Sequence, residues 1–179
     1  MQSNQQQQPL PEHWLRGPVQ NIILPLQPVA HALLQAQDEI NEMMIDFPPQ
    51  LLWESVAGKA SVGFHLQHIA GVQDRLFTYA ENKLLSDQQM VKLKSEGKRN
   101  EEINPAILLE KLNAQFNESI RRLSLFTEEI TWQERKVGRK QLPSTVHGLL
   151  FHAAEHTMRH TGQLLVTIAV LNNNHQHSL

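Results

Sequence analysis

The sequence contains no cysteine among its 179 residues, and this absence excludes several classes of protein. Disulfide-stabilised folds, thiolate zinc fingers, iron–sulfur clusters and enzymes with a cysteine nucleophile all need a thiol of their own. Any metal site must therefore use imidazole, carboxylate or water as ligands. Any reaction that consumes a thiol must take that thiol from outside the chain.

The chain also lacks a marked excess of charge of either sign. Sixteen lysines and arginines stand against 18 aspartates and glutamates, which gives a formal net charge of −2. A charge this small supplies no broad cationic surface for phosphates or anionic lipids. We therefore expect no nucleic-acid partner.

Long hydrophobic runs are missing as well. Residues 1–11 are polar and rich in glutamine, and they have neither the basic segment nor the apolar core of a secretory signal. The longest nearly unbroken apolar run is Leu164 to Leu171. It is far shorter than the roughly 20 residues that cross a bilayer. We expect a cytoplasmic protein with no membrane span and no membrane partner.

Strand-like alternation and internal repeats are also absent, and four segments instead carry apolar residues at three-and-four spacing. The expected helices cover about residues 26–44, 61–85, 104–128 and 144–171. Their starting signals are Pro28 in a first turn, Ser61 and Ser144 as N-caps, and Asn104 followed by Pro105. The sequence thus predicts an all-α four-helix bundle, with either an up-down or a crossed topology.

The remaining segments complete the predicted organisation. A disordered glutamine-rich tail covers residues 1–13, a single domain covers 14–171, and a polar tail covers 172–179. Residues 86–104 are expected to form a solvated connection with at most one helical turn around 90–93. Residues 135–141 are cationic and are expected to form a surface loop rather than a strand.

Histidine is the residue type that points to chemistry, since six of the ten histidines fall on two predicted helices. His65 and His68 lie on the second helix; the fourth carries His147, His152, His156 and His160. The last three are spaced by four residues, which stacks them along one helix face.

The pair His156 and His160 has the spacing of two ligands for one metal ion. Imidazoles at i and i+4 can converge on one ion at metal–nitrogen distances of about 2.0–2.1 Å. A zincin-type peptidase is not expected, because Thr157 follows His156 where such a helix carries its glutamate base. The third ligand is expected from the second helix, from His65 or His68, and His68 is favoured because it adjoins the buried edge at Ile69. The alternative is that these histidines are hydrogen-bonded core side chains.

Two segments resemble the DinB-like superfamily, which includes thiol transferases of the bacillithiol type. They are SVGFHLQHIAG (residues 61–71) and HTMRHTGQL (residues 156–164), and residues 14–18 and 142–145 are similar as well. The resemblance extends from about residue 14 to residue 171. It implies a four-helix bundle of the DinB/YfiT-like metalloenzyme type, with a divalent metal held by His68, His156 and His160.

The metal site suggests two kinds of function. In the first, the metal is catalytic and the protein is a thiol S-transferase-like enzyme or a hydrolase. It would act on a small-molecule substrate and use a low-molecular-weight thiol, such as bacillithiol, mycothiol or glutathione, as cosubstrate. The imidazole donors suit zinc, nickel, iron or copper, and we expect zinc or nickel.

In the second, the metal only stabilises a non-catalytic helical protein with a stress-response or interaction role. A homodimer is expected in either case, and its contact face is expected on the first helix around Met43 and Met44.

Several nearby residues are candidates for supporting roles. Glu155, Gln163 and His152 are expected to hydrogen-bond to a ligand ring and fix its tautomer, although each has an ordinary surface or core role as its alternative. Arg75 and Arg159 are candidates for binding an anionic substrate group. The alternative for both arginines is a salt bridge with a carboxylate.

Overall fold

The computed structural model describes residues 10–177, so residues 1–9 and 178–179 of the two predicted tails lie outside it. Most of the described chain is helical. The α-helices are α1 (Gln27–Met43), α2 (Val62–Ala80), α3 (Asp87–Ser95), α4 (Pro105–Leu123), α5 (Glu128–Thr131) and α6 (Val146–Gln176). Three 3₁₀ helices and two strands complete the elements: η1 (His13–Leu15), η2 (Leu24–Leu26), η3 (Pro49–Leu51), β1 (Glu134–Val137) and β2 (Leu142–Thr145).

The predicted helix starts are confirmed to within a residue or two. Ser61 caps α2 by accepting from the backbone N–H of Phe64, and Asn104 caps α4 by accepting from that of Ile107. The last long helix is capped by Thr145 rather than Ser144. The predicted ends are less accurate: α2 and α4 stop about five residues early, and α6 continues to Gln176.

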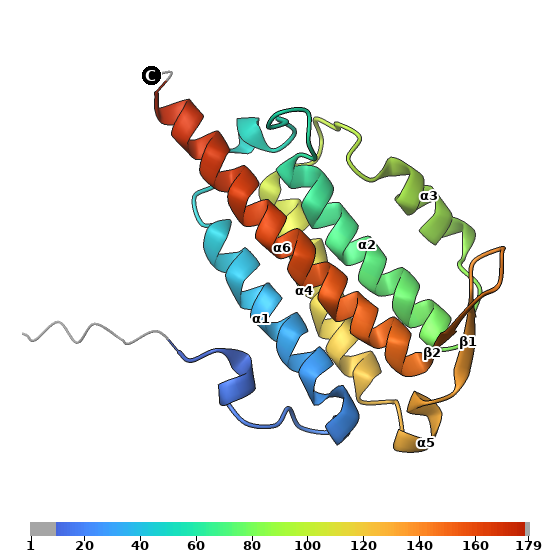
Figure 1. Cartoon of the computed structure of the whole chain (residues 1–179). Helices are drawn as coiled ribbons and strands as arrows, with labels where there is room; N and C mark the ends of the chain where they lie inside the picture. The colour runs from blue at the N-terminus through green and yellow to red at the C-terminus, as the bar shows by residue number, and fades with distance from the viewer. Residues whose placement is uncertain (1–9, 178–179) are drawn as a thin grey trace, which may run out of the picture.

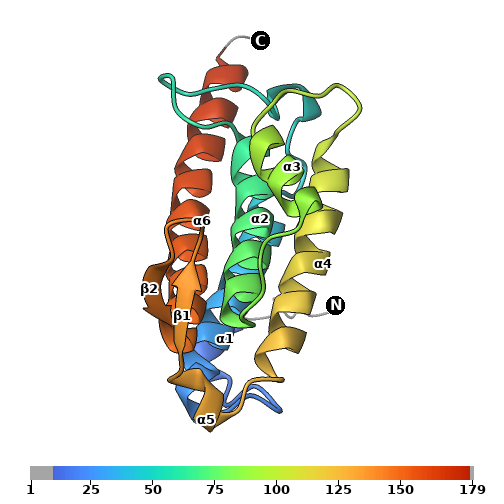
Figure 2. The same cartoon turned by 90° about the vertical axis from the view of Figure 1, so that its right-hand side faces the viewer.

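The four long helices pack side by side in a crossed arrangement. α2 lies against α6 and α4, α1 lies against the same two helices, and α1 and α2 occupy opposite corners. Figures 1 and 2 show α1 and α6 running in one direction and α2 and α4 in the other. The connection that contains α3 therefore spans the length of the molecule, which decides between the two topologies left open by the sequence. α2 and α6 are antiparallel neighbours, so their facing side chains meet over many turns.

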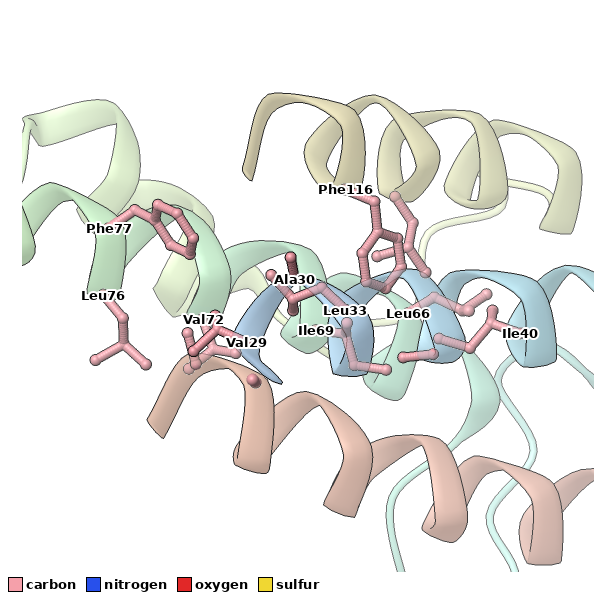
Figure 3. Close-up of a cluster of buried hydrophobic side chains, with 14 of the residues drawn as sticks. Val29, Ala30, Leu33, Ile40, Leu66, Ile69, Val72, Leu76, Phe77 and Phe116 are labelled. Atoms are coloured by element: carbon pink, nitrogen blue, oxygen red, sulfur yellow. The ribbon is translucent and has the colours of Figure 1, made fainter. Parts of the chain in front are cut away.

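The core fills the space between these helices with aliphatic and aromatic side chains. Figure 3 shows α1 side chains such as Leu33 and Ile40 beside Leu66 and Ile69 of α2 and Phe116 of α4. All five are at most 1% exposed. A close-packed interior of this kind holds α2 and α6 at a fixed separation.

Met43 and Met44, where the contact face of a dimer was expected, are largely covered by the chain itself. Met44 is buried and Met43 packs against the core. Met44 lies four residues after the buried Ile40, in line with the inner stripe of α1, whereas Met43 is half-buried.

The loop predicted for residues 135–141 is wrong in part, because the chain forms a β-hairpin there. β1 pairs with β2 in antiparallel register, with Glu134 opposite Thr145 and Val137 opposite Leu142. Gly138 and Gln141 have positive φ values, of 65° and 51°, which close the turn. The strands are four residues long and show no apolar alternation, so the periodic signal of a strand is missing from the sequence.

The connection between α2 and α4 contains a full helix, where only one turn was expected. Ser86 and Gln89 form a reciprocal capping box that starts α3. No residue of α3 is buried, and the helix lies beside α2 in Figure 2. A cavity of about 530 Å³ lies between α2, α3 and α4.

None of the helices within residues 10–177 is both long enough and apolar enough to cross a membrane.

Candidate metal centre

Three histidines from α2 and α6 meet where these antiparallel helices face each other. His68 comes from α2, and His156 and His160 come from successive turns of α6. Each offers a ring nitrogen, and the three nitrogens all lie within 4.8 Å of one another. The Nε2 atoms of His68 and His156 are 2.9 Å apart. Three imidazole nitrogens this close fit a single transition-metal ion.

The three rings are packed against one another and against an aromatic neighbour. The centroid of the His160 ring lies 4.5 Å from that of His68 and 4.6 Å from that of His156. Phe64 stacks on His68 with centroids 5.0 Å apart and ring planes 12° from parallel. This stack covers one face of the His68 ring and restricts its rotation.

His65 is a partner of the cluster rather than a member of it. Its Nδ1 lies 3.0 Å from Nδ1 of His160, so one of these nitrogens donates a hydrogen bond to the other. His65 is only 3% exposed. Its contact occupies the Nδ1 side of His160 and leaves Nε2 of that ring for a ligand.

Burial keeps the imidazoles of His65, His156 and His160 neutral at physiological pH. Burial, together with the charge of His68, lowers the pKa of His65 to about 4. Burial, the charge of His68 and then that of His156 lower the pKa of His160 to about 4. The pKa of His156 is lowered for similar reasons. Neutral imidazole is the form that binds metals, so His156 and His160 need little deprotonation to accept an ion.

Glu96, the residue directly after α3, reaches the far side of His68. Its Oε2 lies 2.7 Å from Nδ1 of His68, and its Oε1 accepts a hydrogen bond from Arg75 at 2.5 Å. The carboxylate is 7% exposed. Burial alone would raise the pKa of Glu96, but the hydrogen bonds from His68 and Arg75 outweigh it and hold that pKa below its ordinary value. Glu96 is therefore an ionised acceptor at the edge of the cluster.

The structure brings His68, His156 and His160 together as the sequence predicted, and their role as metal ligands stays a prediction. Of the two α2 candidates, His68 faces the α6 pair through its Nε2, whereas His65 contacts His160 through Nδ1. His147 lies away from the cluster and packs on Trp132.

The residues predicted to support the ligands take other partners. Glu155 pairs with Arg159 and lies 3.4 Å from His152, and these three form an exposed group on α6. Gln163 is exposed. Within residues 10–177, none of the three predicted supports donates to or accepts from a ring nitrogen of the cluster, although His152 packs against the His156 ring. The two arginines are paired with carboxylates, Arg75 with Glu96 and Arg159 with Glu155.

Sequence reasoning missed Glu96, the one carboxylate of the described residues that hydrogen-bonds to the cluster. It lies 28 residues from His68, in a polar segment of mixed charge. The Ser86–Gln89 capping box was the available signal for a helix in this segment. It carries no information about where the end of that helix docks.

Comparison with known proteins gives a consistent picture. The family model described as DinB superfamily matches residues 32–164. A crystal structure of a protein from Streptococcus pneumoniae is similar in fold, with a TM-score of 0.61 and 12% sequence identity. The match covers 90% of this chain and 97% of the other. No curated protein matches the sequence.

Proposed function

The chain belongs to the DinB superfamily, and from that premise we propose that it is a metal-dependent enzyme with a three-histidine site. His68, His156 and His160 would hold one divalent transition metal, zinc or nickel by preference. One observation carries the proposal: three ring nitrogens from two antiparallel helices lie within 4.8 Å of one another. The proposal also assigns the chain to the four-helix bundles of the DinB/YfiT-like type.

The residues present fit the metal by donor type and by protonation. Burial lowers the pKa of His156 and His160, so both rings are ready to bind at neutral pH. Within the described residues, the group contains three histidines and no fourth protein ligand, although His156 also lies in a second group with His152 and Glu155. Catalytic sites keep such an open position, whereas structural sites close it. This difference favours the catalytic role over a purely structural one.

When bound, the metal would act as a Lewis acid that lowers the pKa of a coordinated thiol or water. The chain's own residues prepare the site around it. His65 holds the Nδ1 side of His160, Glu96 holds that of His68, and Phe64 shields one face of the His68 ring. Each contact limits ring motion, which keeps the three nitrogens together.

We place thiol S-transfer first among the reactions and hydrolysis second. Because the chain has no cysteine, the thiol must be a small-molecule cosubstrate. The other substrate would be a small electrophile. If turnover is absent, the remaining reading is a metal-stabilised helical protein with a stress-response or interaction role.

The same proposal includes a homodimer that forms through the outer face of α6. Phe151, Leu165 and Val166 are 57%, 54% and 62% exposed on that helix. Phe151 and Leu165 are separated by about four helical turns, so they lie close to the same face. Gly162, between them, has open space where a side chain would be. Two copies related by a twofold axis can place this face against itself.

Metal analysis of the untagged protein tests the site. We expect close to one zinc or nickel per chain in the unsubstituted protein and a loss of at least tenfold in affinity in His160→Ala. His31→Ala serves as a control, because His31 lies on α1 and contacts the backbone oxygen of Gly17. Equal metal content in His160→Ala and the unsubstituted protein would overturn the site.

Turnover is tested with a panel of low-molecular-weight thiols and electrophiles. A rate that needs added metal and disappears in His160→Ala supports the transferase. If the protein binds metal but shows no metal-dependent rate with any thiol, the enzyme proposal fails and the metal has a structural role.

A further inference from the structure

The contact between Glu96 and His68 links the histidine cluster to a helix that is otherwise weakly attached. We propose that Glu96 is a positioning residue: it fixes the tautomer of His68 for metal binding and couples metal occupancy to the docking of α3 on α2. This inference rests on the proposed metal site and assigns a residue and a helix to it.

The tautomer follows from the chemistry of the carboxylate. Arg75 donates to Oε1 of Glu96, and a carboxylate held in this way accepts at its other oxygen, so Nδ1 of His68 carries the proton of the 2.7 Å contact. The lone pair of a neutral His68 ring is then on Nε2, the nitrogen that faces His156. A carboxylate on the outer nitrogen also raises the basicity of the ligand nitrogen.

The partners of the other two rings differ from Glu96. Nδ1 of His160 faces the neutral ring of His65, and Nδ1 of His156 is buried without a hydrogen-bond partner in the described part of the chain. Glu96 therefore supplies the charged hydrogen bond to the cluster. It is also held in place from behind, because Arg75 binds its second oxygen.

Two glycines provide the space in which this contact forms. A Cβ atom at Gly71 would collide with Oε1 of Glu96 and would lie 2.6 Å from Nη1 of Arg75. Gly97 has φ of +76°, and a Cβ there would lie 2.8 Å from the Phe64 ring. The N–H of Gly97 donates to Oε1 of Gln67 at 2.7 Å. The segment after α3 is thus fitted closely to the surface of α2.

α3 itself has little else to hold it. None of its residues is buried, and its Lys92 and Ser95 line the cavity of about 530 Å³ that lies between α2, α3 and α4. At its start, the Gln89 side chain donates to Asp74 and Thr78 of α2. At its end, Glu96 provides the most buried contact. An element attached by so few contacts opens locally at low free-energy cost.

These observations make metal binding and α3 docking reciprocal. A metal bound to Nε2 of His68 makes the N–H at Nδ1 a stronger hydrogen-bond donor to Glu96. A docked Glu96 in turn makes Nε2 of His68 a stronger metal ligand. By linkage, each must favour the other by the same factor.

The test compares zinc affinity, measured by competition with a chelating dye, in four proteins. We expect Glu96→Ala to bind zinc about 10- to 100-fold more weakly than the unsubstituted protein, the range typical for loss of such a partner. Glu101→Ala is the matched control, because Glu101 is an exposed carboxylate whose side chain pairs with Arg99. Gln89→Ala loosens the start of α3 and leaves Glu96 in place.

Hydrogen exchange of residues 87–97 separates coupling from damage to the fold. Zinc should slow exchange in this segment in the unsubstituted protein and in Gln89→Ala, but not in Glu96→Ala. Nitrogen-15 NMR of the metal-free protein should show His68 protonated on Nδ1, and this preference should weaken in Glu96→Ala.

The outcomes distinguish this inference from the proposed function. An unsubstituted protein that binds no zinc overturns the metal site itself. If Glu96→Ala binds zinc with the same affinity as the unsubstituted protein, the positioning role is overturned. Zinc binding that leaves exchange in residues 87–97 unchanged overturns the coupling to α3.

Discussion

The buried histidines give the metal-free protein a distinctive pH dependence. His65 has a pKa of about 4 in the folded chain, because burial disfavours its charged form, against an ordinary value of 6.5. Between these values the unfolded chain binds a proton that the folded chain does not. Stability therefore falls as the pH is lowered through this range. The lowered pKa values of His156 and His160 act in the same direction.

We expect the metal-free protein to lose stability between about pH 6.5 and pH 4.5, with roughly 2 kcal/mol of the loss due to His65. Urea unfolding with chelator present at a series of pH values measures this slope. Glu81 and Glu96, whose pKa values are lowered, add their losses as the pH falls below 4.5, so the window isolates the histidines. His65→Gln should flatten the profile. A stability that is constant or rises from pH 6.5 to pH 4.5 would contradict the assignment.

At the scale of single elements, the start of α2 depends on a close contact with the loop before it. The N–H of Gly63 donates to the backbone oxygen of Leu52, and the ring of Trp53 lies over the Gly63 Cα. A Cβ at this position would collide with the indole ring. Gly63 thus allows the loop that contains Trp53 to pack closely on the first turn of α2. His65 lies two residues further along the same helix.

We expect Gly63→Ala to destabilise the protein by about 1–3 kcal/mol, because Trp53 must move. Alanine at an open helical site has the opposite effect, since it raises helix propensity by up to about 1 kcal/mol. Gly162→Ala on α6 is therefore the matched control, compared at protein concentrations where the chain is monomeric, because nothing lies within 4 Å of its added Cβ. Chemical unfolding followed by tryptophan fluorescence measures both. Equal stabilisation by the two substitutions would show that Trp53 does not pack on Gly63.

At this scale, elements fixed by neighbouring residues are predictable from the sequence, whereas elements held by distant residues are not. The caps at Ser61 and Asn104 are predictable because each side chain bonds to a backbone N–H three residues away. The hairpin of β1 and β2 is less predictable, because it depends on support from elsewhere. Arg135 donates to the backbone oxygen of Ala80 at the end of α2, and Val146 donates to that of Gln133.

At the scale of the whole molecule, the outer face of α6 exposes three large apolar side chains. One side of α6 packs on α1 and α2, and the other leaves Phe151, Leu165 and Val166 exposed. Leu165 and Val166 are neighbours on this face, whereas Phe151 lies on the far side of the paired Glu155 and Arg159. Exposed apolar side chains gathered on one face of a helix favour an interface.

We expect the protein to be a dimer at micromolar concentration and Val166→Glu to shift it toward monomer by at least tenfold in dissociation constant. The buried like charges would repel across the twofold axis. Analytical ultracentrifugation measures the change. Leu84→Glu is the control, because Leu84 is a highly exposed leucine just after α2. A monomeric unsubstituted protein would contradict the dimer. Equal effects of Val166→Glu and Leu84→Glu would show that the dimer contact does not lie on α6.

The sequence by itself determined the features that depend on neighbours along the chain. Helical periodicity and caps located the four long helices, and the four-residue spacing of His156 and His160 placed both rings on one face of α6. These follow from the fixed geometry of a helix, which needs no knowledge of its surroundings. The absence of cysteine likewise excludes thiolate ligands and any thiol supplied by the chain itself.

Only the tertiary structure decided which distant groups meet. It turned His68 rather than His65 toward both rings of α6 and brought Glu96 to the far side of His68 across 28 residues. It also covered Met44 and left Val166 exposed. Such contacts depend on helix rotation and crossing, which the packing of the whole core fixes. The histidine pair is thus a property of the sequence, whereas the complete centre and its link to α3 are properties of the fold.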